Sequence, residues 1–437
     1  MTMTIGKNSH FGILRPIRAF CGSEKGSVIP LVGLAFFVIM GAIGMAIDIG
    51  RAQLVESRLM NSIDAAGLAA GAKLNTASVQ NEVEKFVHAN YPAGYADSVV
   101  SSIATAVTDG GNTITVSATA VMQTAFMQLF GVDEVTVSAT SEITRAIGGL
   151  ELSLVLDNTG SMGNNNKLED LQDASHELLN IVFGSETTAN RLFVGVVPFS
   201  QSVNIGTGRA AWLNAAPPAG WGGCVRARTG PDLIDRDTSD DPPTTELFAR
   251  YTSSSGCPAP LTPMTNVKAT LDDAIDDMVA NGLTHVNYGA VWGWRMLSPK
   301  WRAAWGINIG GQELPLDYDA PSMKKAAVIM TDGENTMRDN RYTAYGELDE
   351  GNLNGATSEN NAVNELNDRL LMVCNNMKNA GITVYTVAFG NPGAAIEAMM
   401  EQCASQSDFY FDPSSGADLS LAFQVIGDSL ANLRVSK

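Results

Sequence analysis

A run of uncharged, mostly apolar residues extends from Val28 to Ile47, near the start of the chain. About 20 such residues in a helix span the hydrocarbon core of a bilayer. Pro30 lies in the first turn of this helix, where its missing N–H costs little. A cleaved signal peptide, cut near Ala42–Gly44, is the alternative, but its apolar region is usually only about 7–15 residues long. The sequence therefore predicts a transmembrane helix over residues 27–47.

Basic residues precede this run and set its expected orientation. Residues 1–26 contain Lys7, Arg15, Arg18 and Lys25. Because positively charged flanks stay in the cytoplasm, residues 1–26 are expected to be a cytoplasmic basic tail. Everything after Asp48 is then expected on the outer side of the membrane, in a single-pass arrangement.

The cysteines agree with this orientation. The chain has five, Cys21, Cys224, Cys257, Cys374 and Cys403, and no two form a Cys-x-x-Cys pair. Cys21 falls on the reducing side, and the other four form an even set on the oxidising side. Four cysteines allow three connectivities, and four free buried thiols are the alternative. We expect the pairs nearest in sequence, Cys224–Cys257 and Cys374–Cys403.

Length and charge narrow the class of protein. The 437 residues have room for two or three domains, and 45% are hydrophobic. A formal net charge of −18 argues against nucleic-acid binding, because no basic surface would neutralise phosphates. The four histidines are scattered, so a histidine-based transition-metal site is not expected.

The segment over residues 48–147 predicts a small α+β region. The helix is expected to continue from Asp48 to Ala72, and a second helix is expected near residues 78–89. From Ser98 to Thr144 the pattern changes to an alternation of apolar and polar residues, with Asp109-Gly110-Gly111 between two of the runs. Such alternation predicts strands, and the intervening residues predict a hairpin.

Oxygen-bearing side chains follow a short apolar run at residues 152–156. Asp157, Thr159 and Ser161 present three of them from one tight loop. Oxygen ligands on a loop at the carboxyl end of a strand suit a hard divalent cation such as Mg²⁺. Taken alone, the same residues also fit an ordinary turn.

Two later stretches strengthen the metal interpretation. Residues 281–284 form a loop that contributes the hydroxyl of Thr284, and an apolar helix start follows it. Residues 326–331 form a second buried run that ends at Asp332-Gly333. Three loops of an α/β pattern therefore offer oxygen ligands in sequence order.

These loops resemble the metal-ion-dependent adhesion site of the von Willebrand factor type A domain. That family has Asp-x-Ser/Thr-x-Ser in the first loop, a Thr in the second and an Asp in the third, and Asp157, Thr159, Ser161, Thr284 and Asp332 match all five positions. The resemblance implies a bound Mg²⁺, Mn²⁺ or Ca²⁺. Asp157, Ser161 and Thr284 would hold the ion directly, with Thr159 and Asp332 linked through water and one position left open for a partner's carboxylate.

The remaining pattern agrees with an α/β, doubly wound, mostly parallel sheet over residues 148–437. In such sheets ligands bind outside the carboxyl ends of the strands, which is where Asp157 and Asp332 fall. The expected strands are 153–156, 191–199, 326–331, 382–389 and 409–411, and the expected helices are 168–183, 369–380, 394–402 and 419–433.

Two stretches interrupt this pattern. Residues 206–265 form a long insertion rich in Pro, Gly, Asp and Thr, which we expect to lie over or beside the metal site. Residues 288–305 hold four of the six tryptophans. Core packing is the favoured interpretation of these tryptophans, and an exposed recognition patch is the alternative.

The amino-terminal region carries a second resemblance. Residues 46–51 and 59–72, including Asp48-Ile-Gly50-Arg51 and Asp64-Ala-Ala-Gly67, are similar to the TadE/TadG-like proteins of bacterial Tad (tight adherence) Flp-pilus assembly. TadG-type members join this anchor to a type A domain, as here. Gly22 and Gly26 lack the glutamate that a prepilin cleavage site requires, so we expect a part of the assembly machinery rather than a fibre subunit.

The resemblance implies a non-enzymatic component of Tad/Flp pilus assembly in the bacterial inner membrane, with its bulk in the periplasm. The expected partners are other Tad/Flp pilus-assembly proteins or an envelope protein. A cell-surface adhesin is the alternative. A metal-dependent hydrolase is a weaker one, because His285, beside Thr284, is the one candidate base and the sequence shows no Gly-x-Ser-x-Gly, His-Glu-x-x-His or His–carboxylate arrangement.

Overall fold

The long apolar run begins a single helix. The computed structural model describes residues 28–71, 79–108, 113–144, 148–230, 232, 236–253, 255–321 and 323–435, and α2 covers Val28–Gly71. Its first half exposes nearly every side chain, and it is long and apolar enough to cross a membrane. The expected cytoplasmic tail, Cys21 and the turn at Asp109–Gly111 lie outside the described residues.

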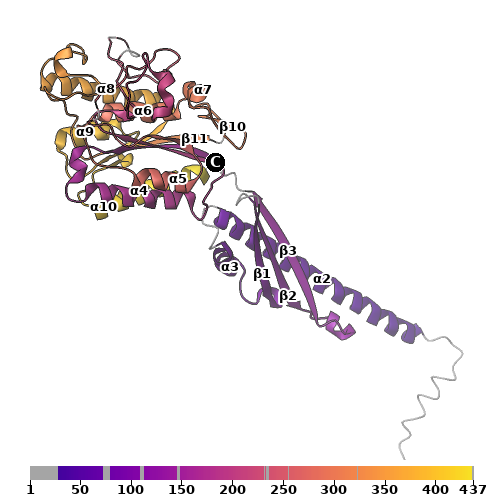
Figure 1. The fold of residues 1–437 in the computed structure, drawn as a ribbon. Coiled ribbons are helices and arrows are strands. Elements are labelled where there is room, and N and C mark those ends of the chain that lie inside the picture. Colours follow the sequence, from indigo (N-terminus) through magenta and orange to yellow (C-terminus); the bar gives the residue numbers. More distant parts are fainter. Residues whose placement is uncertain are drawn as a thin grey trace, which may run out of the picture. The chain divides into compact units, whose positions relative to one another are not determined.

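The second half of α2 belongs to a small α+β unit. A short helix, α3 (Val79–Asn90), and three strands, β1 (Ser98–Thr108), β2 (Thr113–Gln123) and β3 (Glu134–Thr144), complete it. The strands form one sheet in the order β1-β2-β3 and lie along α2 (Figure 1). Alternate residues of β2 are buried, as are Val55, Leu59 and Ile63 of α2, so the period-2 pattern buries one face of the sheet.

An eight-stranded sheet organises the second unit. Its strand order is β13-β12-β11-β4-β5-β6-β7, with β8 beside β5. The pairs from β13 to β5 are all parallel, and β6, β7 and β8 are added antiparallel at the far edge. The core strands are β4 (Gly149–Asp157), β5 (Leu192–Phe199), β11 (Met323–Thr331) and β12 (Thr383–Ala388).

Helices cover both faces of this sheet (Figure 1). Leu152 and Leu154 of β4 pack in one core with α4 (Lys167–Phe183) and α10 (Gly416–Val435), while Val155 faces the other core. That second core contains α6 (Val286–Leu297), α8 (Glu359–Asn379) and α9 (Ala394–Cys403). Because both faces are covered, the strands are continuous apolar runs rather than alternating ones.

The remaining elements are short. They are β6 (Val203–Asn204), β7 (Cys224–Val225), β8 (Thr262–Thr265), α5 (Lys268–Asp276), α7 (Arg302–Trp305), the hairpin β9 (Ile307–Ile309) and β10 (Gln312–Leu314), β13 (Tyr410–Phe411), and the 3₁₀ turns η2 (Tyr95–Asp97), η4 (Met127–Phe130), η5 (Gly160–Gly163), η6 (Thr207–Trp212), η7 (Pro299–Trp301), η8 (Leu348–Glu350) and η9 (Ser407–Phe409).

The helix predicted over residues 369–380 is found as α8, but its predicted start is wrong. The helix begins at Glu359 instead of Arg369, after Ser358, whose Oγ accepts a hydrogen bond from the Asn361 N–H at 3.4 Å. Four asparagines in this first half hide it, because asparagine is a poor helix former that is common in turns.

The tryptophan-rich stretch is part of the core. Trp292 and Trp301 are fully buried, and Trp294 and Trp305 are nearly so. Trp292 and Trp301 meet edge to face with their ring centroids 5.4 Å apart. The packing interpretation is therefore confirmed, and these side chains form no exposed recognition patch.

Candidate metal centre

Two acidic residues meet at one edge of the sheet. Asp157 is the last residue of β4, and Asp332 directly follows β11. These two strands are parallel neighbours, so their carboxyl ends lie side by side. The sheet thus brings together two carboxylates that are far apart in the sequence.

Asp157 is fully buried beneath the loop that follows it. The backbone N–H of Thr159 donates to its Oδ1 at 2.7 Å, and the Thr331 hydroxyl donates to its Oδ2 at 2.7 Å. The side chain is therefore held in one orientation from both sides.

Two hydroxyls connect the first loop to the third. Ser161 donates to Oδ1 of Asp332 at 2.5 Å, and the hydroxyls of Thr159 and Ser161 are 3.0 Å apart. Four of the five predicted residues, Asp157, Thr159, Ser161 and Asp332, thus belong to one hydrogen-bonded network.

The second loop is held against the first by its backbone. Gly160 N–H donates to the carbonyl of Gly282 at 3.0 Å, and Asn281 N–H donates to that of Asn158 at 2.7 Å. Thr284, two residues further on, is buried, and its N–H donates to the Thr336 hydroxyl at 2.9 Å. Thr284 therefore lies on a loop that is bonded to the backbone of the first loop.

The electrostatics of this centre favour a cation. Burial, and secondarily the charge of Asp332, raise the pKa of Asp157 to about 7. Two carboxylates and several hydroxyls form an oxygen-only donor set, which fits a hard divalent ion. Among the described residues no three His, Cys, Asp or Glu side chains gather as a metal-binding group, so hydroxyls would have to complete the shell.

Lys167 is part of the centre and was not predicted. It is the first residue of α4, and its ammonium donates to Oδ2 of Asp332 at 2.8 Å. Nothing in the sequence marks it, because a lysine at the start of a helix is usually a solvated surface residue. Thr331 was also missed, although a hydroxyl immediately before Asp332 could have indicated it.

The candidate base His285 lies in the protein interior. His285 is fully buried, and its Nε2 is 3.0 Å from the carbonyl of Thr336. Burial lowers its pKa to about 4. His285 is therefore neutral near pH 7, and its ring is hydrogen-bonded to the backbone carbonyl of Thr336.

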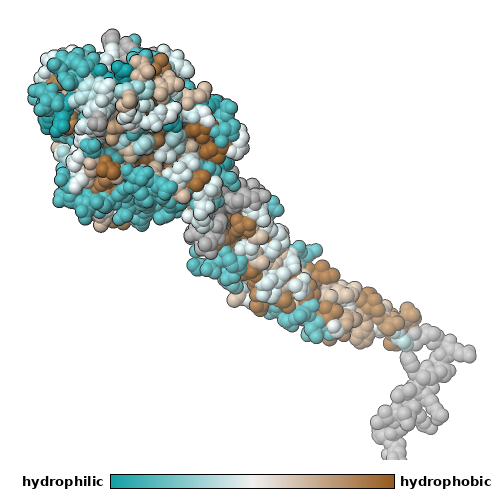
Figure 2. Space-filling view, viewed as in Figure 1, coloured by the Kyte–Doolittle hydropathy of each residue, from teal (hydrophilic) through white to brown (hydrophobic). Residues whose placement is uncertain are grey.

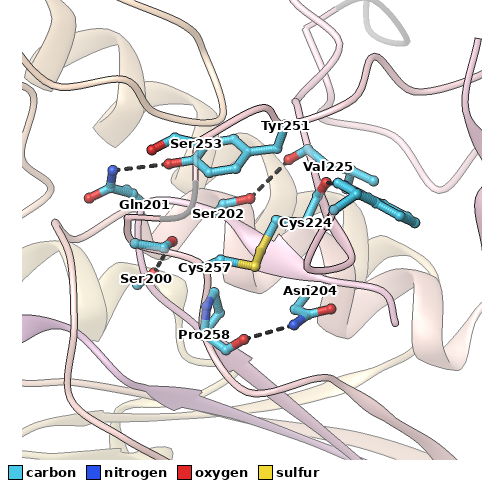
Figure 3. Close-up of a disulfide and its surroundings, with 12 residues drawn as sticks. Ser200, Gln201, Ser202, Asn204, Cys224, Val225, Tyr251, Ser253, Cys257 and Pro258 are labelled. Carbon is cyan, nitrogen blue, oxygen red and sulfur yellow. Dashed lines mark hydrogen bonds between the residues drawn. A yellow bond between two sulfur atoms is a disulfide. The ribbon is translucent and has the colours of Figure 1, made fainter. Parts of the chain in front are cut away.

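The insertion reaches the second loop of the centre. Ser200 donates to the carbonyl of Gly256 at 2.8 Å, and a Cβ on Gly282 would lie 2.9 Å from Cα of Gly256. Figure 3 shows the disulfide Cys224–Cys257 that closes this part of the insertion, with Cα atoms 5.8 Å apart. The insertion therefore lies beside the centre, as expected.

Side-chain hydrogen bonds fix the same region (Figure 3). Asn204 donates to the carbonyl of Pro258 at 2.9 Å, and Ser202 donates to that of Val225 at 2.9 Å. The second disulfide, Cys374–Cys403, joins α8 to α9. Both disulfides are the predicted pairs, which lie nearest to each other in the sequence.

Residues 26–73 match the model of a family described as putative Flp pilus-assembly TadE/G-like. The match covers the long apolar helix and ends within the segment that follows it. No curated protein matches the chain.

Several solved structures are similar to the chain. Proximal thread matrix protein 1 from the mussel byssus is 16% identical, with a TM-score of 0.35 over 64% of this chain and 48% of that one. The pilus adhesin SpaC from Lactobacillus rhamnosus GG is 12% identical, with a TM-score of 0.38 over 77% of this chain and 34% of that one. This chain thus spans about half or less of each of these two.

The von Willebrand factor domain of the type V pili tip protein Mfa5 from Porphyromonas gingivalis is 12% identical, with a TM-score of 0.38 over 67% of this chain and 97% of that one. The sheet order and the helices on both faces give the second unit the doubly wound, mostly parallel α/β fold that the sequence predicts.

Proposed function

We propose that this chain, whose TadE/G-like region and type A fold match a TadG-type protein, is a membrane-anchored component of Flp-pilus assembly that binds a partner protein. The proposal rests chiefly on one observation. The buried carboxylates of Asp157 and Asp332 meet at the carboxyl edge of the sheet and are linked through Thr159 and Ser161. No enzymatic activity is proposed, because the candidate base His285 is sequestered.

The centre suits Mg²⁺ or a similar divalent ion. Asp157, Ser161 and Thr284 would hold it directly, while Thr159 and Asp332 would act through water. Carboxylate oxygens can accept more than one interaction each, so Asp157 and Asp332 keep acceptor capacity beyond their present hydrogen bonds. The bound ion would offer an open position to an Asp or Glu of the partner.

The partner is expected among the other Flp-pilus assembly proteins or the proteins of the envelope. We propose that residues 27–47 cross the inner membrane, that residues 48–147 form the TadE/TadG-like segment and that the type A domain, residues 148–437, lies in the periplasm. The apolar first half of α2 and the two disulfides support this placement.

Calorimetric titration with Mg²⁺ and Mn²⁺ tests the metal centre, and a pull-down from envelope extract with Mg²⁺ or with chelator tests the partner. Wild type should bind metal and retain a partner only with Mg²⁺. Asp408→Ala, which removes an exposed carboxylate on η9, is the matched control and should behave like wild type. Metal binding by Asp157→Ala equal to that of wild type would show that the centre is misassigned.

The orientation needs its own experiment. A phosphatase fused after Gly149 should be active and one fused after Lys25 inactive, because the enzyme folds only on the oxidising side. Fractionation separates the assembly component from a cell-surface adhesin, which would be exposed beyond the envelope. The reverse fusion result would contradict the periplasmic placement.

A further inference from the structure

The turn between β2 and β3 is unusually apolar. Residues 124–132, Thr-Ala-Phe-Met-Gln-Leu-Phe-Gly-Val, include no charged residue. Leu129 is 79% exposed and Phe130 is 63% exposed, and Phe126 and Val132 are also exposed. Exposed loops of soluble proteins are usually made of Gly, Pro, Asn, Asp and Ser, so water is a poor environment for this turn.

The turn lies against the apolar half of α2. A Cβ on Gly41 would lie 2.9 Å from the ring of Phe130, and one on Gly44 would lie 2.7 Å from Cβ of Phe126. The two glycines let the aromatic side chains approach the helix backbone. Gly41 precedes Ile47, the end of the apolar run, by six residues, which is about 9 Å along a helix.

Asp48 holds the turn in this position. Its carboxylate accepts hydrogen bonds from the backbone N–H groups of Ala125, Phe126 and Met127 at 3.0, 2.8 and 2.8 Å. The side chain is fully buried, although it directly follows the apolar run. The first acidic residue after the run is thus used to fix the turn rather than exposed to water.

The backbone of the turn satisfies most of its other donors internally. Leu129, Gly131 and Val132 donate to carbonyls within the turn at 3.1, 3.0 and 3.2 Å. Thr124 closes the base, since its N–H donates to the carbonyl of Asp133 at 3.0 Å and its hydroxyl to that of Val132 at 2.6 Å. Internal satisfaction of the backbone is what a hydrocarbon environment requires.

We propose that the β2–β3 turn, residues 124–132, inserts into the bilayer leaflet nearest Asp48 and contacts lipid acyl chains beside α2. This inference rests on the membrane anchoring of α2. The apolar surface of the turn is continuous with that of the exposed first half of the helix, which Figure 2 shows as hydrophobic. Asp48 and Arg51, which also bonds the carbonyl of Ala96 at 3.0 Å, mark the level where polar groups begin.

Lipid contact can be measured on the full chain in phosphatidylcholine vesicles. Single cysteines at Leu129→Cys, Phe36→Cys and Thr140→Cys, each with Cys21→Ser, would carry an environment-sensitive fluorophore. Position 36 lies in the apolar run, and position 140 is exposed on β3. Labels at 129 and 36 should emit at shorter wavelength, lose intensity with nitroxide-labelled lipid and resist aqueous iodide. The label at 140 should behave in the opposite way.

The controls separate the possible failures. Lipid quenching at 36 together with iodide quenching at 129 would overturn the proposal and leave the anchoring intact. A label at 129 that resists both quenchers would mean that another copy of the chain covers the turn, which also overturns it. No lipid quenching at 36 would overturn the anchoring and the inserted turn together. Leu129 is largely exposed, so its replacement leaves the fold unchanged.

Discussion

Asp48 and Asp157 are both fully buried carboxylates at the end of an apolar segment, yet their surroundings differ. Asp48 accepts hydrogen bonds from three backbone N–H groups and has Arg51 at 3.5 Å. Asp157 accepts one backbone N–H and one hydroxyl, and a second carboxylate, Asp332, is nearby.

The difference separates a structural carboxylate, Asp48, from Asp157, which is proposed to bind a metal ion. The charge of Asp48 is balanced by backbone dipoles and a neighbouring cation, so this site needs nothing further. Asp157 and Asp332 together have Lys167 as their one bonded cation among the described residues. One lysine thus faces two carboxylates at the candidate metal centre, whereas the single carboxylate of Asp48 has three backbone donors and an arginine.

Among the substitutions considered, Asp48→Ala should have the largest effect, which is a loss of stability of the β2–β3 turn. Each backbone donor left without a partner costs about 1–3 kcal/mol where water cannot replace the carboxylate, and three donors are involved. Residues 124–132 should exchange their amide hydrogens much faster, as measured by mass spectrometry on the full chain. Glu56→Ala, an exposed position on the same helix, is the control. Unchanged exchange would mean that the turn is held by its apolar contacts alone.

Asp157→Ala should abolish metal binding while the domain stays folded, because the sheet has its own apolar core. Asp332→Ala should weaken binding less, by about 10–100-fold, since a residue that acts through water typically contributes that much. Titration with Mn²⁺ and circular dichroism measure the two properties. Equal losses for the two variants would contradict the assignment of Asp332 to a water-mediated role.

The metal-free protein should show a pH dependence that Asp48 does not produce. The pKa of Asp157 is raised from 3.8 to about 7, so its contribution to stability is complete below pH 4 and is lost as the pH rises through 7. Thermal unfolding in chelator should therefore show Asp157→Asn gaining stability relative to wild type between pH 5 and 8. A constant difference between the two proteins would mean that Asp157 is ionised throughout this range.

Lys167→Met should have the smallest effect, and it should raise the Mg²⁺ affinity that Asp157→Ala and Asp332→Ala lower. The lysine is partly exposed, and such an ion pair contributes up to about 1 kcal/mol, so its removal should raise Mg²⁺ affinity by at most about fivefold. Lys268→Met, which removes a lysine paired with Asp272 on α5, is the matched control and should leave the affinity unchanged. A weaker affinity in Lys167→Met would show that the lysine orients Asp332 for the ion.

Much of the type A fold follows from the sequence. Helical periodicity predicts α4, which spans Lys167–Phe183, because one face of this helix is buried. A short apolar run predicts β4, because this strand is buried along its whole length. The order of the three loops predicts where Asp157 and Asp332 fall. The start of α8 could not be predicted, since its asparagines compete with the backbone for hydrogen bonds.

Contacts between distant residues account for the other omissions. Asp48 bonds backbone groups 77 to 79 residues away, and backbone N–H groups leave no mark in a sequence. Lys167, in the first turn of α4, bonds the carboxylate of Asp332, which lies 165 residues away in the sequence. The hydrogen bonds of Asp48 and of Lys167 both depend on how distant elements pack together, and local sequence patterns do not encode that packing.

The length of α2 has a mechanical consequence. One helix runs from Val28 to Gly71, about 66 Å at 1.5 Å per residue, without an interruption where the apolar run ends. The β2–β3 turn, which is hydrogen-bonded to Asp48, packs against the helix where the apolar run ends. A sideways force on the Gly71 end of this helix would therefore act as a torque on its apolar half. In a membrane, such a torque would tilt the whole helix rather than bend it at a hinge.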